Sequence, residues 1–190
     1  FFIGVCATLL ATSLGTVAAL GLSRPHMPFK GTLMAILISP MIVPLIITSA
    51  GMFFFYSKIG LTHTYLGLIL AHTALGTPFV VITVTATLTG FDTNLIRASQ
   101  SLGADTMRTF FKVIMPLILP GVISGGLFAF ITSFDEVVVV MFIGSVEQIT
   151  IPKQMWAGLR QETSPVILCM ATCLVALSIG LLTTVEMLRR

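Results

Sequence analysis

Five long apolar stretches limit what this chain can fold into. They cover residues 1–22, 31–56, 64–88, 117–143 and 165–187. A helix needs about 20 mostly apolar residues to cross the hydrocarbon core of a bilayer, so each stretch is long enough to span one. Because unpaired backbone groups are not tolerated in lipid, we expect helices rather than isolated strands. The chain is therefore predicted to be all-α, a polytopic membrane helix bundle with five spans in a single transmembrane domain over residues 1–190.

The composition agrees with a lipid environment. Of the 190 residues, 56% are hydrophobic and only 9% are charged, whereas soluble domains carry about 25% charged residues. The net charge is +3 and the basic residues are scattered, so we expect no nucleic-acid partner. Cys6, Cys169 and Cys173 have no histidine or acidic neighbours. We interpret them as packing residues and expect no disulfide, metal site or cofactor.

The lysines and arginines predict the orientation of the chain. One side of the membrane receives 7 of them and the other side receives 3. The seven are Arg24, Lys30, Arg97, Arg108, Lys112, Arg189 and Arg190, and the three are Lys58, Lys153 and Arg160. By the positive-inside rule, residues 91–116 and the C-terminus are expected in the cytoplasm. Five spans then place Phe1 on the outer side.

The longest polar interval lies between the third and fourth apolar stretches. Two helix-prone pieces, residues 93–102 and 105–115, flank Gly103. Asp105 suits the N-terminus of the second piece, and Pro116 is expected to end it. We predict a helix, a turn and a second helix that lie on the membrane face.

The same interval resembles a known motif. Arg97-Ala98-Ser99 is followed by three residues, Gly103, nine residues and then Val113-Ile114-Met115-Pro116. This spacing is similar to the cytoplasmic loop of ABC importer permeases, which reads Glu-Ala-Ala, three residues, Gly, nine residues and Ile-x-Leu-Pro. The chain departs from this pattern at Arg97, which stands where the family has Glu. It departs conservatively at Ser99, Val113 and Met115.

The resemblance implies a fold, a role for this loop and a set of partners. In the family the loop is a short coupling helix that docks in a cleft of the ATP-hydrolysing subunit. It implies a type I importer permease fold with three kinds of partner: a dimer of ATP-binding ABC ATPase subunits, a companion permease subunit and an extracytoplasmic solute-binding protein. Such permeases commonly have six spans, so we expect one span before Phe1 to be missing from this sequence. The residues assigned to coupling are Arg97, Ala98, Ser99, Gly103, Ala104, Asp105 and Pro116.

The chain carries no motif for ATP hydrolysis of its own. The sequence contains no GxxxxGK[ST] phosphate loop, no HExxH and no Gly-x-Ser-x-Gly. Energy for transport would therefore come from another subunit, and we predict a transport subunit rather than an enzyme.

An acidic pair, Asp135 and Glu136, interrupts the fourth apolar stretch. Acids inside an apolar run are costly unless they face water, a cation or a partner. They could line a translocation path for a cationic solute, or they could cap a neighbouring helix or lie near an unwound turn. Because consecutive helical residues point about 100° apart, we expect only one to face the path. His72 in the third stretch is a further path candidate, and a hydrogen bond to a neighbouring helix would also explain it.

Residues 133–167 extend the resemblance. They look like the matching region of the second permease of spermidine/putrescine-type importers, with the acidic pair, a Thr150-Ile151-Pro152 step, an outer helix over residues 153–160 and Ser164-Pro165. This implies that a small solute, such as a polyamine, crosses the inner membrane. The alternatives are an importer of another small solute such as an amino acid, a cation channel, and a membrane enzyme that uses Asp135, Glu136 and His72.

Small residues recur every four positions in three of the stretches, and we expect these stripes to be helix-packing surfaces. They are Ala7, Ala11, Gly15 and Ala19; Gly121, Gly125 and Ala129; and Thr172, Ala176 and Gly180. Pro40 and Pro44 lie inside the second stretch and Pro78 inside the third, where each favours a kink.

Overall fold

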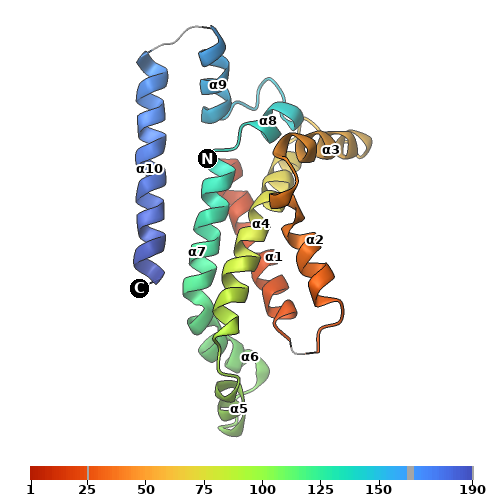
Figure 1. Ribbon diagram of the computed structural model, residues 1–190, viewed down its shortest axis with the longest axis vertical. Coiled ribbons are helices and arrows are strands. Elements are labelled where there is room, and N and C mark those ends of the chain that lie inside the picture. Colours follow the sequence, from red (N-terminus) through yellow and green to blue (C-terminus); the bar gives the residue numbers. More distant parts are fainter. Residues whose placement is uncertain (25, 162–164, 190) are drawn as a thin grey trace.

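The computed structural model describes residues 1–24, 26–161 and 165–189, and every regular element in these ranges is a helix. Helices α1 (Phe2–Leu22), α4 (Tyr65–Thr89) and α7 (Met115–Phe134) stand side by side, and α10 (Pro165–Arg189) stands beside α7 (Figure 1). The all-α prediction is confirmed. The first, third and fifth predicted spans agree with α1, α4 and α10 to within two residues at each end.

The second predicted span is two helices. Helices α2 (Lys30–Ile42) and α3 (Leu45–Lys58) meet at a bend of 105°, so the second predicted span is broken at Pro44, where the sequence favours a kink. Pro44 has no N–H to donate, and Val43 before it is extended with φ −72° and ψ 134°, as residues before proline tend to be. The bend lays α3 across one end of the bundle (Figure 1).

The fourth predicted span begins and ends earlier than residues 117–143. A continuous helical segment runs from Thr106 to Phe134. It consists of α6 (Thr106–Thr109), the π-helix η1 (Phe110–Ile114) and α7. Pro116 therefore does not end a helix but lies in the first turn of α7. A proline does not fit a regular helix interior, and here one wider π turn precedes it; such a turn is a common local adjustment.

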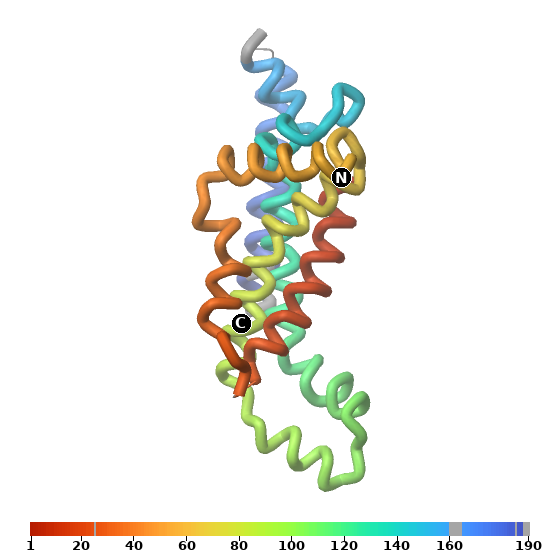
Figure 2. The backbone as a smooth tube through the Cα atoms, turned by 90° about the vertical axis from the view of Figure 1, so that its right-hand side faces the viewer, coloured from red at the N-terminus to blue at the C-terminus, as the bar shows by residue number. Residues whose placement is uncertain are grey.

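The short helices gather at the two ends of the bundle. Helices α5 (Asn94–Ser101) and α6 lie at one end (Figure 2). Helices α3, α8 (Val138–Ile143) and α9 (Ile151–Gln161) lie at the other. The helix predicted over residues 153–160 is confirmed as α9, whereas Ser164 and Arg190 lie outside the described residues.

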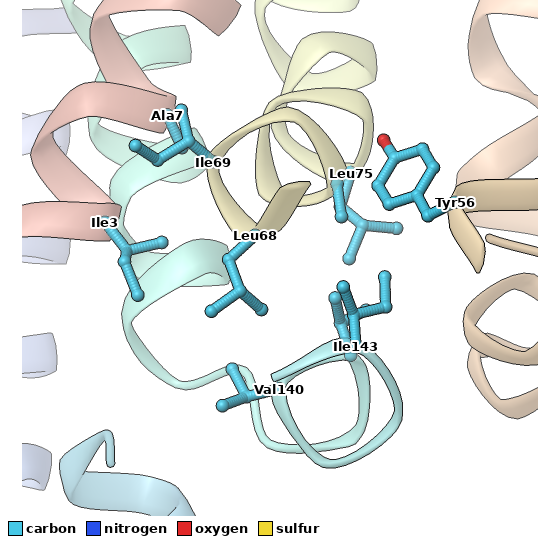
Figure 3. Close-up of a cluster of buried hydrophobic side chains, with 10 residues drawn as sticks. Ile3, Ala7, Tyr56, Leu68, Ile69, Leu75, Val140 and Ile143 are labelled. Atoms are coloured by element: carbon cyan, nitrogen blue, oxygen red, sulfur yellow. The ribbon is translucent and has the colours of Figure 1, made fainter. Parts of the chain in front are cut away.

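A buried apolar cluster ties α8 to the bundle. It combines side chains of α1, α3, α4 and α8 (Figure 3). Its labelled members are Ile3, Ala7, Tyr56, Leu68, Ile69, Leu75, Val140 and Ile143. Because α8 is packed in this cluster, residues 135–137 connect α7 to a helix whose position is fixed.

Two of the three small-residue stripes are packed inside the chain. The stripes on α1 and α7 are buried, and both approach Val80 of α4. A Cβ added at Gly15 would lie 2.7 Å from the Val80 Cβ, and one added at Gly125 would lie 2.8 Å from the Val80 Cα. The stripe on α10, comprising Thr172, Ala176 and Gly180, is exposed. The packing prediction is confirmed for two stripes, and the third has no cover within the described residues.

Candidate functional site

The turn between α5 and α6 is built around Gly103. This glycine has φ +82°, a left-handed conformation that residues with a Cβ adopt at a cost. Its N–H donates to Gln100 O at 2.9 Å, and the N–H of Ala104 donates to Ser99 O at 3.1 Å. These two bonds form a Schellman motif, which satisfies the last carbonyls of a helix. The turn predicted at Gly103 is confirmed.

Two further bonds fix how α6 follows that turn. The Asp105 side chain accepts from the Arg108 N–H at 2.7 Å and caps α6, as its position in the sequence predicts. The hydroxyls of Ser99 and Thr109 lie 2.9 Å apart. Thr109 is buried, and it was not identified from the sequence because the two residues lie ten positions apart on different helices. The bonds hold α5 in a set direction relative to the long α6–α7 segment.

One side of α5 faces away from the bundle. Arg97 and Ala98 are exposed, and Leu102 at its end is 89% exposed. On the opposite side, a mainly apolar cavity of about 380 Å³ separates α5 from the ends of α1 and α4. Its lining includes Leu20, Leu88, Phe91, Ile96, Phe110 and Ile114. The outward side of α5 is thus free to meet another protein, and the cavity lies behind it.

The acidic pair lies at the opposite end, where α7 stops. Asp135 is the residue after α7, and residues 135–137 separate α7 from α8. The Asp135 side chain is exposed, whereas Glu136 is only 7% exposed. Glu136 Oε1 accepts from the Val139 N–H at 2.9 Å in the first turn of α8. Glu136 therefore caps a neighbouring helix, which is one of the two roles considered for the acidic pair, whereas Asp135 is exposed.

His72 is buried next to the end of α7. It is 2% exposed, and its Nδ1 lies 2.7 Å from the Ser133 Oγ in the last turn of α7. Its Nε2 is buried, and no group in the described part of the chain bonds it. The structure thus brings His72 to the end of α7 that carries the acidic pair, as a buried link between two helices. Within the described residues no group of three or more His, Cys, Asp or Glu side chains could hold a metal ion.

The family can now be stated. Residues 11–190 match the model of the family described as "Binding-protein-dependent transport system inner membrane component". The chain belongs to this family. It is a multi-pass inner membrane permease of a binding-protein-dependent ABC importer, and it is the transport component rather than a catalytic subunit. Membership also implies ATPase and binding-protein partners within such an importer.

Within this family, the chain is similar to several curated permeases. The chain is 30% identical over 184 residues to the spermidine/putrescine transport system permease protein PotC of Haemophilus influenzae, covering 97% of this chain and 72% of that protein. It is 28% identical to PotC of Escherichia coli strain K12, covering 98% and 70%. It is 29% identical to the putrescine transport system permease protein PotI of the same strain, covering 90% and 63%.

A solved structure shows the same fold. The chain superposes on an inward-facing structure of the MetNI methionine ABC transporter with a TM-score of 0.76, covering 98% of this chain and 90% of that one. The sequence identity is 20%, so this likeness concerns the fold alone. It confirms the predicted importer permease architecture.

Proposed function

We propose that this permease carries a polyamine such as spermidine or putrescine. The main support is the similarity to the PotC and PotI permeases, which extends over 90–98% of this chain. A cationic solute also suits an exposed carboxylate at a break between helices, because such a group is stabilised by a cation or water. An importer of another small solute is the alternative.

We propose that Asp135, Glu136 and His72 form the polar part of the solute path. The exposure of Asp135 supports its direct contact with the solute. Glu136 and His72 are buried beside it, where they hold the surrounding helices. An ammonium group of the solute would pair with the Asp135 carboxylate as it passes the end of α7.

Coupling to ATP hydrolysis is assigned to the loop at residues 91–116, within one transmembrane domain of residues 1–190. Arg97, Ala98 and the end of α5 would dock on the ATPase subunits. The Gly103 turn, Asp105 and the Ser99–Thr109 bond make the loop stiff enough to transmit a rigid-body movement. Because α6, η1 and α7 are continuous, movement of α5 would reach Asp135 along one helix.

The positions of the basic residues support a cytoplasmic location for this loop. The α5–α6 end carries Arg97, Arg108 and Lys112, while Lys58 and Lys153 lie at the opposite end. By the positive-inside rule the first end and the C-terminus face the cytoplasm. The binding protein would then dock at the end with α3, α8 and α9, and the ATPase dimer at the end with α5. A companion permease would complete the path.

The test is ATPase activity of the complete complex in liposomes with its binding protein. Putrescine and spermidine are compared with a panel of amino acids and sugars. Stimulation by polyamines alone supports the proposed solute. Stimulation by another solute keeps the importer and rejects the polyamine, and solute flux without ATP would indicate a channel.

Asp135→Asn tests the path itself. We expect the KM for spermidine uptake to rise about tenfold, which corresponds to ~1.4 kcal/mol, because the variant removes a negative charge from the solute contact. Glu186→Gln is the matched control, since it removes an exposed acid from α10, near the end of the chain. Equal KM values for Asp135→Asn and the parent would reject this path.

A further inference from the structure

We propose that His72 is a positioning residue for Asp135, acting through its hydrogen bond to Ser133. The inference rests on the proposed function, in which Asp135 meets the solute. In this role the buried imidazole does not contact the solute. It fixes the end of α7 and thereby the direction of the Asp135 carboxylate.

The bond joins distant parts of the chain at a crowded point. His72 lies in the first third of α4, Ser133 lies in the last turn of α7, and they are 61 positions apart in the sequence. A Cβ added at Gly4 of α1 would lie 3.7 Å from the Ser133 Oγ. Three helices therefore meet around this bond. Both side chains are buried, so water does not compete for it.

The end of α7 needs such an anchor. The last carbonyls of a helix have no partner within the helix, and α7 ends at Phe134, one residue after Ser133. Ser133 lies two residues before Asp135, on the last turn. A bond from Ser133 to α4 therefore holds the backbone turn from which the Asp135 side chain projects.

Glu136 holds the other side of the break. Its Oε1 bonds the Val139 N–H in α8, and α8 is packed in the apolar cluster with α4. The segment is thus tied to α4 directly through Ser133 and to α8 through Glu136. Between these two fixed points the Asp135 side chain is the exposed one. Breaking the His72–Ser133 bond frees one side of the segment and lets the carboxylate change direction.

The test measures the environment of position 135 without relying on transport. The complete complex carries Asp135→Cys, with Cys6, Cys169 and Cys173 replaced by alanine, and is labelled with a membrane-impermeant maleimide. We expect His72→Leu and Ser133→Ala to change the labelling rate at position 135 at least about threefold, since each removes the same anchor and favours local opening. His72→Asn retains a polar group near the position of Nδ1 and is expected to restore the parent rate.

Ser124→Ala is the matched control. Ser124 is a second buried serine on α7, and its hydroxyl has no hydrogen-bond partner. Its loss should leave the labelling rate unchanged. Equal rates for Ser133→Ala and Ser124→Ala overturn the inference, and this comparison decides the matter even where His72→Leu does not assemble.

Uptake kinetics in otherwise native complexes separate this inference from the proposed function. We expect His72→Leu and Ser133→Ala to raise the KM for [14C]spermidine with a smaller change in Vmax, as Asp135→Asn does. A change in labelling together with a normal KM for Asp135→Asn would keep the anchor and reject the solute path. A raised KM for Asp135→Asn with unchanged labelling would keep the path and reject the anchor.

Discussion

Gly103 is the residue on which the proposed coupling loop, residues 91–116, depends most directly. Its φ of +82° lies in the region that residues with a Cβ avoid, and a Cβ there would meet no atom within 4 Å. The obstacle to substitution is therefore backbone conformation rather than space. In left-handed geometry a non-glycine residue costs about 1–2 kcal/mol, and a β-branched residue costs more.

We expect Gly103→Val to reduce solute-stimulated ATPase activity of the assembled complex several-fold, because the Schellman turn no longer sets the direction of α5. Gly103→Ala should have a smaller effect in the same direction. The KM for the solute should change little, since the turn lies at the end opposite Asp135. Gly51→Ala in α3 is the control, as that position has an ordinary φ and open space. Full activity of Gly103→Val would contradict the assignment.

At this scale the local features could be predicted and the long-range ones could not. Gly103 and Asp105 act on residues within five positions, so turn and cap chemistry identifies them from the sequence. The His72–Ser133 bond depends on how α4 packs on α7. The different exposure of Asp135 and Glu136 depends on where α7 stops, and the hydrophobic pattern continues through that point to Ile143.

At the scale of helices, the effect of each proline could not be predicted from the sequence alone. Pro40, Pro44 and Pro78 carry the same local signal, yet only Pro44 lies at a break between helices. Helix α4 passes through Pro78 within the buried centre of the bundle, where neighbouring helices stabilise it. Helix α3 instead turns away and packs against α8. Helix α2 also passes through Pro40, although none of its residues is buried, so the proline alone does not decide between a kink and a break.

The π-helix η1 absorbs one extra residue between α6 and α7. A π turn holds one residue more than an α turn, so deleting Lys112 should convert it to an α turn and leave α6 and α7 in nearly the same register. Deleting Leu117 from the regular helix α7 should instead rotate everything before it by about 100°. We expect the Leu117 deletion to abolish solute-stimulated ATPase activity and to weaken retention of the ATPase subunits during purification, whereas the Lys112 deletion should retain both. Full activity of the Leu117 deletion would show that the rotation of the proposed coupling loop about the α7 axis is unimportant.

The contact between α4 and α7 has a steric limit at Gly125. An added Cβ would approach the Val80 Cα to 2.8 Å, and a backbone atom cannot move aside as a flexible side chain can. We expect Gly125→Ala to destabilise the bundle by about 1–3 kcal/mol, the usual cost of overpacking, and to lower the thermal unfolding midpoint. Gly21→Ala at the open end of α1 should not lower it. An unchanged midpoint for Gly125→Ala would show that the helices separate easily.

For the whole molecule, α10 is the least covered span. Its half-buried residues, which include Met170, Leu174 and Leu181, lie on one side. Among the described elements, only α7 and α9 make extensive contact with it. The exposed stripe of Thr172, Ala176 and Gly180 lies on the other side. Small residues at four-residue spacing let helix backbones approach closely, and apolar burial offers no drive to association in lipid. The stripe therefore suits a helix of the proposed companion permease.

Gly180→Leu tests this assignment. The position has open space, since no described atom lies within 4 Å of an added Cβ, so the isolated subunit should insert and remain as stable as the parent. The assembled complex should form in several-fold lower yield, since the bulky side chain separates the two backbones. Native gels of the co-expressed subunits measure the yield, and Gly51→Leu is the matched change at another open glycine. Equal yields for Gly180→Leu and the parent would mean that this side of α10 faces lipid, and the companion would then contact another helix.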